Sequence, residues 1–514
     1  MGEGRQGFRS AGRQLNAYSY FRRAFEARLS QSFLLADDGT TYTYADLERE
    51  TGRVAAFLTG LGLRKGDRVA VQVEKSPEAL FLYLGTLRAG LCFLPLNTAY
   101  QRAELGYFLK DAEPRVVVSR TQSAAALAKL CSETGVPHLY TLDEHGRGTL
   151  ADAMALVAPG FSDPQLAEQD LAAIVYTSGT TGRSKGAMVT HGNLTSNGQV
   201  LKDYWRFTEN DVLLHALPIF HVHGLFVAMH TTLIAGARML FHRRFDARAV
   251  LAALPAATAM MGVPTFYTRL LAEPALTRDA VKHMRLFISG SAPLLLDTFK
   301  EWQSRTGHTI LERYGMSEAG MITSNPYEGE RRGGTVGFPL PGVSVRVATA
   351  DGRALAPGEA GEVQIRGPNV FAGYWRLPEK TREEFTADGW FHTGDVGQWS
   401  ADGYLSIVGR AKDLIISGGY NVYPKEIELV IDALQGVLES AVVGVPHPDF
   451  GEAVTAIVVQ HDDAALDEAA VIAHVKSQIA NYKVPKRVVF VKELPRNAMG
   501  KVQKNVLRDL CAES

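Results

Sequence analysis

Short apolar runs alternate with amphipathic stretches over the first two thirds of the chain. Runs rich in branched residues, typical of buried strands, occupy residues 68–73, 115–119, 172–176, 258–262 and 286–289. Apolar residues at helical spacing predict helices at 44–61, 77–89, 194–204, 247–253 and 293–306. Strands that alternate with helices in this way predict layered α/β structure with largely parallel sheets.

The pattern changes near residue 340. Strand-like runs at 343–348, 361–366 and 403–408 are separated by turn signals such as Asp351-Gly352 and Asp402-Gly403, which predicts a β-rich part over 340–409. Beyond it, a helix at 424–434, strands at 440–445 and 454–460, a helix at 468–482 and a strand at 487–491 form a compact α+β unit. We therefore expect an N-terminal domain over 1–409 and a C-terminal domain over 410–514.

Composition narrows the class of protein. A chain of 514 residues with 46% apolar and 21% charged residues is typical of a globular protein of two or more domains. A net charge of −1 gives no field that would favour nucleic acid. Three widely spaced cysteines fit a reducing cytoplasm. The apolar run 79–96 is interrupted by Arg88 and Pro95, so a buried helix and strand are expected there rather than a membrane span.

One loop carries most of the chemical information. Residues 176–186 read Tyr-Thr-Ser-Gly-Thr-Thr-Gly-Arg-Ser-Lys-Gly, directly after an apolar run. Glycines allow the backbone to approach a bulky anion, and the hydroxyls and the lysine add donors and positive charge, which suits a polyphosphate. The spacing differs from a Walker loop, because Lys185 comes three residues after Gly182. A polar surface turn is the alternative. The expected phosphate contacts are Thr177, Ser178, Gly179, Thr180, Thr181, Gly182 and Lys185.

Four more segments follow in order: Arg-Tyr-Gly-Met-Ser-Glu at 313–318, Trp-Phe-His-Thr-Gly-Asp at 390–395, Gly-Arg-Ala-Lys-Asp at 409–413 and Pro-Arg-Asn-Ala-Met-Gly-Lys at 495–501. Together with the loop they resemble the signatures of the adenylate-forming superfamily, which includes acyl-CoA synthetases, adenylation domains and luciferase. The resemblance covers residues 30–510. It implies ATP, Mg²⁺ and coenzyme A as ligands, an acyl-adenylate intermediate, and a small C-terminal domain that moves during the reaction.

The resemblance also implies residue roles on the nucleotide. Glu318, a hard oxygen ligand, would hold Mg²⁺ together with Thr177. Asp395 would accept hydrogen bonds from the ribose hydroxyls. A solvated helix carboxylate and an ordinary turn aspartate are the respective alternatives. The further residues expected to bind the nucleotide are Ser291, Ala292, Pro293, Arg313, Tyr314, Gly315, Met316 and Ser317, and the segment 313–318 would pack on adenine.

The same resemblance gives the C-terminal segments their roles. Lys501 would contact the acyl carboxylate and the α-phosphate during adenylation only, although a solvated charge is the default for a lysine near a chain end. Arg410 would bond the ribose and Lys412 would be the pivot of domain rotation. That rotation would bring Ser417, Gly418 and Gly419 to line a tunnel for the thiol. Lys501 is also a candidate for acetylation, which would remove its charge.

Segments 203–208, 215–227, 261–271, 284–295 and 421–426 look like those of the malonyl-CoA synthetases, which implies malonate as the acid. A buried second carboxylate needs a partner, and a guanidinium is the natural one. We expect Arg285 in this role first and Arg269 second, either of which could instead be a structural ion-pair partner. Ser289 and Thr265 are expected as hydroxyl donors, and the resemblance implies that His221 gates the acyl pocket.

Three other functions stay open at this stage. The first is a ligase for methylmalonate or another short acid, since one extra methyl changes binding by only ~1–3 kcal/mol. The second is an amino-acid adenylation module, which residues 217–227 disfavour because they offer no carboxylate for an α-amino group. The third is a nucleotide-binding scaffold without activity, which the presence of Glu318, Asp395, Arg410 and Lys501 disfavours.

Overall fold

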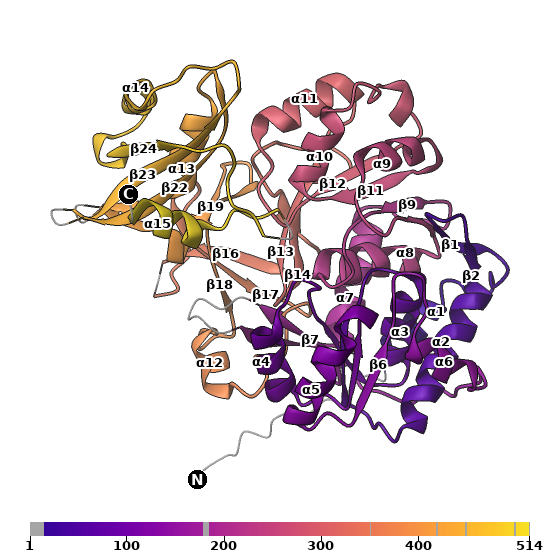
Figure 1. Cartoon of the computed structure of the whole chain (residues 1–514). Helices are drawn as coiled ribbons and strands as arrows, with labels where there is room; N and C mark the ends of the chain where they lie inside the picture. Colours follow the sequence, from indigo (N-terminus) through magenta and orange to yellow (C-terminus); the bar gives the residue numbers. More distant parts are fainter. Residues whose placement is uncertain are drawn as a thin grey trace, which may run out of the picture.

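A computed structural model describes residues 15–177, 184–349, 351–417, 420–447, 450–497 and 500–512. In the described residues, the large N-terminal part contains a six-stranded, a nine-stranded and a four-stranded sheet, and the C-terminal part forms a separate lobe beside it (Figure 1). The expected α/β class, with a β-rich part and a small α+β C-terminal unit, is confirmed. Among the described helices, none is long and apolar enough to cross a membrane.

The first sheet has six strands in the order β6-β5-β3-β4-β7-β8. All neighbours are parallel except the β7–β8 hairpin, whose connection contains the expected phosphate loop. Its strands are β3 Arg68–Gln72, β4 Cys92–Pro95, β5 Val116–Ser119, β6 His138–Thr141, β7 Leu171–Thr177 and β8 Lys185–Thr190, and the helices between them are α3 Pro77–Arg88, α4 Arg102–Ala112, α5 Ala124–Thr134 and α6 Thr149–Ala155.

The second sheet has nine strands in the order β15-β14-β13-β12-β11-β9-β10-β1-β2, with a parallel centre from β13 to β1. Its strands are β1 Ser32–Ala36, β2 Thr41–Thr43, β9 Val212–His215, β10 Arg238–Phe241, β11 Ala259–Gly262, β12 Leu286–Ser289, β13 Leu311–Met316, β14 Gly320–Ser324 and β15 Phe338–Pro339. The accompanying helices are α1 Ala17–Arg22, α2 Tyr44–Gly60, α7 His191–Tyr204, α8 Met229–Ala235, α9 Ala247–Ala253, α10 Pro264–Leu271 and α11 Leu296–Thr306. One hydrophobic core contains residues from both sheets.

The expected β-rich part is an antiparallel sheet of β16 Ser344–Ala348, β17 Ala360–Arg366, β18 Phe391–Trp399 and β19 Leu405–Arg410, with the short helix α12 Pro378–Glu383. The C-terminal lobe contains β20 Ile415–Ser417, β21 Tyr420–Val422, β22 Val437–His447, β23 Gly451–Gln460 and β24 Arg487–Phe490, covered by α13 Pro424–Asp432, α14 Glu468–Gln478 and α15 Lys504–Ala512. The chain passes from β19 to β20 through a single 3₁₀ turn, Ala411–Asp413. The exact domain division at 409/410 stays a prediction.

Two helices of the C-terminal lobe differ from the sequence expectation. Helix α14 ends at Gln478 rather than 482, because Ile479 adopts an extended conformation and closes the helix. Helix α15 was not expected. It buries Leu507 and Cys511, which are four residues apart and therefore lie on one face.

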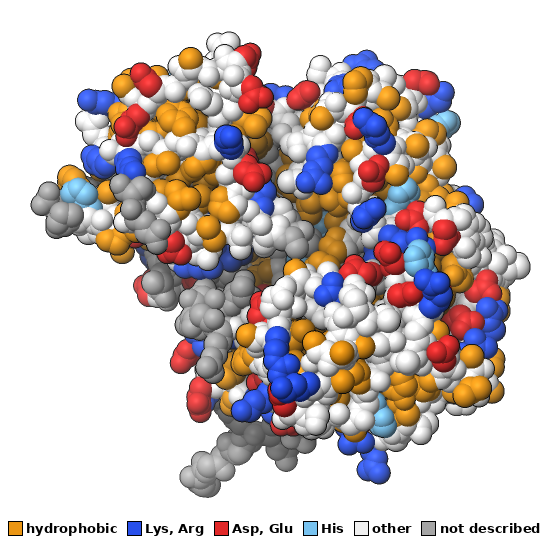
Figure 2. Space-filling view, viewed as in Figure 1, with side chains coloured by type: hydrophobic (Ala, Val, Ile, Leu, Met, Phe, Trp, Pro, Cys, Tyr) orange, Lys and Arg blue, Asp and Glu red, His pale blue; other side chains and the backbone are white. Residues whose placement is uncertain are grey.

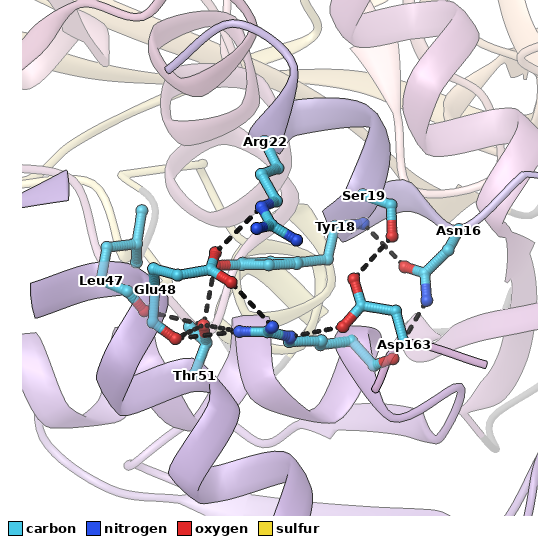
Figure 3. Close-up of polar contacts among 9 residues, drawn as sticks. Asn16, Tyr18, Ser19, Arg22, Leu47, Glu48, Thr51 and Asp163 are labelled. Atoms are coloured by element: carbon cyan, nitrogen blue, oxygen red, sulfur yellow. Dashed lines mark hydrogen bonds and ion pairs between the residues drawn. The ribbon is translucent and has the colours of Figure 1, made fainter. Parts of the chain in front are cut away.

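A buried arginine joins the first helices of the chain. Arg88, at the end of α3, donates to Asp163 Oδ1 (2.6 Å) and to Glu48 Oε1 (2.8 Å), and its guanidinium lies over the ring of Tyr18. Tyr18 in turn donates to Glu48 and accepts from Thr51 (Figure 3). Because two carboxylates neutralise the guanidinium, a 4% exposed arginine is tolerated there. The network fixes α1 and α2 against α3.

Candidate active site

The strand ends that flank the phosphate loop meet a buried carboxylate. Thr177, the last residue of β7, donates to Glu318 Oε1 at 3.2 Å. Lys185, the first residue of β8, is buried; its ammonium lies 3.1 Å from Glu384 Oε1 and 4.3 Å from the centre of the Tyr374 ring. Ser178, Gly179, Thr180, Thr181 and Gly182, expected to contact phosphate, lie outside the described residues.

Glu318 has the setting expected of a Mg²⁺ ligand. Its side chain is 7% exposed, and Oε1 accepts hydrogen bonds from Thr177 and from Tyr374 Oη (3.2 Å each). Burial raises the pKa of this carboxyl, so a nearby cation would favour its charged form. No group of three or more His, Cys, Asp or Glu side chains suited to a metal occurs in the described part of the chain. One carboxylate and one hydroxyl fit Mg²⁺, which is commonly held by few protein ligands and by substrate phosphates.

The expected ribose site brings three residues together. Asp395, on β18, accepts from Tyr314 Oη of β13 at 2.6 Å. Arg410, paired with it in register on β19, lies 3.0 Å from Asp395 Oδ1. Asp395 is 4% exposed, so these two partners hold its carboxylate in one orientation. The structure thus places the Gly-Asp segment, the tyrosine and the hinge arginine at one point.

Lys501 of the C-terminal lobe lies beside this point. Burial and the neighbouring charge of Arg410 lower its pKa to about 8, and Asp395 partly offsets that effect. A tight turn presents the lysine: Lys501 N donates to Asn497 Oδ1 (3.0 Å), and Asn497 N donates to Lys501 O (2.9 Å). Gly500 has φ +72°, and a Cβ there would lie 3.2 Å from Thr265 Oγ1 of α10. The lysine turn therefore docks against the N-terminal part, at the junction that Figure 2 shows as a hollow.

Arg313, expected near the nucleotide, has an environment that the motif did not predict. It precedes Tyr314 on β13, is 4% exposed, and its Nε and Nη2 have no hydrogen-bond partner within the described protein. Burial lowers its pKa to about 9, which still leaves it charged at pH 7. A Cβ at Gly290 would lie 2.4 Å from the Arg313 Cζ, so a larger residue there would displace the guanidinium. A buried charge with unused donors indicates a place for an anion.

Two histidines lie near Arg313, and two serines flank Gly290 next to its guanidinium. Burial, then Arg313 and Lys501, lower the pKa of His221 to about 4, so this ring is neutral at pH 7. His221 Nδ1 accepts from His223 N (3.2 Å), and His223 Nδ1 lies 3.3 Å from Ser291 Oγ. The Ser289 hydroxyl, at the carboxyl end of β12, is buried without a described hydrogen-bond partner. Ser291 has φ +72°, an uncommon conformation for a residue with a Cβ.

The expectation for Arg285 is wrong. Its guanidinium makes a two-pronged pair with Asp211, with Nε–Oδ1 at 2.6 Å and Nη2–Oδ2 at 2.8 Å, and also donates to Trp205 O. Both residues come just before strands β12 and β9, at the amino ends of parallel strands. The site lies at the carboxyl ends of these strands. The four residues of β12 therefore place Arg285 about 13 Å from the end of the strand that faces the site. The structural ion-pair alternative is the correct one.

The other expected residues divide into three sets. Arg269 lies on α10 with an exposed side chain, which does not suit a partner for a buried carboxylate, whereas Thr265 on the same helix faces the lysine turn. Ser291, Ala292 and Pro293 follow β12, and Gly315, Met316 and Ser317 follow Tyr314, so these two segments lie at the carboxyl ends of adjacent strands. Lys412 lies in the 3₁₀ turn and Ser417 on β20, while Gly418 and Gly419 are outside the described residues.

Comparison with known proteins decides the family. The model of the AMP-binding enzymes matches residues 21–375, and that of the AMP-binding enzyme C-terminal domain matches residues 426–501. The chain is an AMP-binding enzyme. This AMP-binding enzyme is similar to feruloyl-CoA synthase of Amycolatopsis sp (37% identical; 91% of this chain, 94% of the relative) and to malonate–CoA ligase of Arabidopsis thaliana (34%; 92% and 85%). The expected adenylate-forming superfamily is thereby confirmed.

The solved structures of MatB from Rhodopseudomonas palustris are similar over the whole enzyme. The ATP-bound form is 54% identical, covers 97% of this chain and 99% of its own, and has a TM-score of 0.94. The apo form has the same identity and coverage but a TM-score of 0.84. Because the sequence identity and the coverage are the same for the two forms, the difference in TM-score comes from their conformations. The AMP-binding enzyme described here therefore has a conformation closer to the ATP-bound MatB.

Proposed function

We propose that this AMP-forming acyl-CoA ligase joins malonate to coenzyme A through a malonyl-adenylate, releasing AMP and pyrophosphate. The observation that carries the choice of acid is Arg313: a buried guanidinium, two of whose donor nitrogens have no described partner, beside His221, which is also near Lys501. A dicarboxylate supplies a second negative group that a monocarboxylate lacks. The similarity to malonate–CoA ligase and to MatB supports the same acid.

The first half-reaction needs charge neutralisation. A malonate carboxylate oxygen attacks the α-phosphorus of ATP, and the bond to pyrophosphate breaks. Both reactants are anionic, so a cation at the α-phosphate stabilises the charge that builds up. Lys501, whose pKa is about 8, is mainly protonated at pH 7 and supplies that cation. Arg313 would hold the distal carboxylate in a two-pronged contact, with Ser289 as an additional hydroxyl donor.

The nucleotide would be held by residues from both flanks of the phosphate loop and from the expected ribose site. Asp395 and Arg410 would bond the ribose hydroxyls, and Tyr314 would keep the Asp395 carboxylate oriented. Thr177 and Lys185 flank the phosphate loop, with Glu384 and Tyr374 fixing the lysine. Glu318 and Thr177 would hold Mg²⁺, which neutralises phosphate charge when it is bound.

The second half-reaction needs Lys501 removed from the site. Lys412 would be the pivot, because the chain crosses between the lobes in the short turn that contains it. Rotation about this turn would bring the segment that begins at Ser417 to the adenylate, where the thiolate of coenzyme A attacks the acyl carbon and AMP leaves.

The test is pyrophosphate release with ATP and a panel of acids, with and without coenzyme A. We expect malonate to give the highest kcat/KM, sustained release only with coenzyme A, and malonyl-CoA as product. A higher kcat/KM for methylmalonate or butyrate would reject malonate as the preferred acid. Sustained release with amino acids alone would instead support an adenylation module.

A further inference from the structure

A buried lysine that the mechanism does not use lies between the six-stranded and the nine-stranded sheet. Lys75 follows β3 of the six-stranded sheet and is 6% exposed. Its ammonium nitrogen lies 2.8 Å from Nδ1 and 2.8 Å from the carbonyl oxygen of His215, the last residue of β9 in the nine-stranded sheet. It also lies 4.2 Å from the centre of the Phe241 ring. The pair therefore joins the carboxyl ends of two strands from different sheets.

The hydrogen bonds fix the state of the histidine ring. His215 Nε2 lies 2.9 Å from the carbonyl oxygen of Gly224. A carbonyl can only accept, so Nε2 carries the proton and donates. Burial and the neighbouring Lys75 lower the pKa of His215 well below its ordinary value, so the ring is neutral. In a neutral ring with the proton on Nε2, Nδ1 is an acceptor, and Lys75 is the donor that satisfies it. The result is a directed chain from Lys75 through His215 to Gly224.

Gly224 belongs to the segment that forms the acyl site. It is the second residue of a π-helical turn, His223–Ala228, a conformation that is frequent at functional sites. A Cβ at Gly224 would lie 2.1 Å from Pro218 O, so segment 218–224 closes tightly on itself. His221 and His223, which face Arg313, lie within this segment. Fixing the Gly224 carbonyl therefore fixes the turn that presents both histidines to the acid.

A small cavity also adjoins the segment. Ile219, Phe220 and Leu225 line a small cavity together with Val73, Phe93 and Pro95 from the end of the six-stranded sheet. Apolar contacts across a cavity constrain position weakly, because the atoms there lack neighbours on one side. The hydrogen bonds of Lys75 and His215 thus give a directional link from the six-stranded sheet to the segment, and the contact of His223 with Ser291 gives a second link, to the end of β12.

We propose that Lys75 is a positioning residue for the acyl site, acting through His215 on the segment 218–224. This inference rests on the proposed function, since it assumes that His221 and His223 line the site of the acid. Lys75 does not touch the reacting atoms. It sets where the two histidines stand relative to Arg313, so its removal affects the acid and spares ATP.

The experiment compares Lys75→Met, which keeps length but loses all donors, with Lys75→Gln, which keeps a neutral N–H donor. Lys65→Met is the matched control, because Lys65 pairs with Asp170 at the surface. KM for malonate and KM for ATP are measured by pyrophosphate release with coenzyme A. We expect Lys75→Met to raise the malonate KM roughly tenfold, as the loss of a buried hydrogen bond implies, and to change the ATP KM less than twofold. Lys75→Gln is expected to fall between wild type and Lys75→Met.

Parallel changes in both KM values, or an unchanged malonate KM, would overturn the positioning role, and so would a Lys75→Gln variant as impaired as Lys75→Met. If Lys75→Met does not fold, the same comparison of the two KM values in Lys75→Gln decides the question. A wild-type enzyme that does not use malonate would reject the proposed function alone. Lys75 would then be judged by the KM for whichever acid the wild type activates.

Discussion

Replacement of Arg313 by methionine tests the assignment of the distal carboxylate. The guanidinium is 4% exposed, and its Nε and Nη2 have no described partner within the protein. Methionine keeps an unbranched side chain but removes the charge and the donors. In the variant, the distal carboxylate of malonate would enter a buried site without its partner. Malonate should therefore bind poorly, while the protein itself loses no internal hydrogen bond from these two nitrogens.

The magnitude follows from the cost of leaving one buried charge unpaired. Removing one partner of such a pair costs about 2–5 kcal/mol, which corresponds to a fall in kcat/KM of roughly 30-fold to 5,000-fold. Butyrate, which has no distal charge, should behave in the opposite way. In the wild type it leaves Arg313 buried and unpaired, so the variant should use butyrate as well as the wild type or better.

The assay is pyrophosphate release with malonate and with butyrate in the wild type, Arg313→Met and Arg313→Lys. Lysine keeps the charge but loses the planar fork, so an intermediate malonate value is expected. Thermal unfolding serves as the control: Arg313→Met should be as stable as the wild type or more so, since an unpaired buried charge is lost. An unchanged ratio of malonate to butyrate kcat/KM in Arg313→Met would refute the reasoning.

Three further predictions follow from the same structure. Lys501→Ala should lower adenylate formation by ~10²–10³-fold, the effect of removing one donor to a developing charge, while thioester formation from pre-made malonyl-adenylate stays within a few-fold; equal losses would contradict its role. The pKa of Lys501 lies near 8, and its charged form acts, so kcat/KM for adenylation in the wild type should fall as pH rises above about 8; a Lys501→Arg variant that kept this limb would assign it to another group. Arg285→Leu leaves Asp211 unpaired and should reduce the free energy of unfolding by about 1–3 kcal/mol in urea titrations, with no change in the malonate KM; a large KM increase would restore Arg285 as the selector.

Much of the site could be predicted because its residues lie within continuous motifs. Thr177, Glu318, Asp395 and Lys501 each belong to a short segment of distinctive residue types, and the structure brings these segments together. The strands were predictable where apolar runs were uninterrupted, as at β3 and β12. Helix α15 is not among the predicted elements, although Val506, Leu507, Leu510 and Cys511 have a helical spacing.

The parts that could not be predicted depend on pairs far apart in the chain. Arg285 and Arg313 both lie at strands of the nine-stranded sheet. The residue pattern around them does not show which one is paired with a carboxylate of the protein and which one is left for a ligand. Asp211, 74 residues away, neutralises the first, whereas Gly290 makes room for the second. Sequence offered one usable signal, namely that a parallel strand carries its functional residues at the carboxyl end. Arg285 comes before its strand, so this rule already disfavours it.

The most direct test of a two-step reaction through malonyl-adenylate is a rapid-quench experiment with wild-type enzyme, malonate and ATP in the absence of coenzyme A. We predict a burst of pyrophosphate equal to the concentration of active sites, with an equal amount of malonyl-AMP recovered from the enzyme. Addition of coenzyme A should convert that malonyl-AMP into malonyl-CoA and AMP. The formation of ADP and phosphate, or the appearance of malonyl-CoA with no malonyl-AMP before it, would contradict the account.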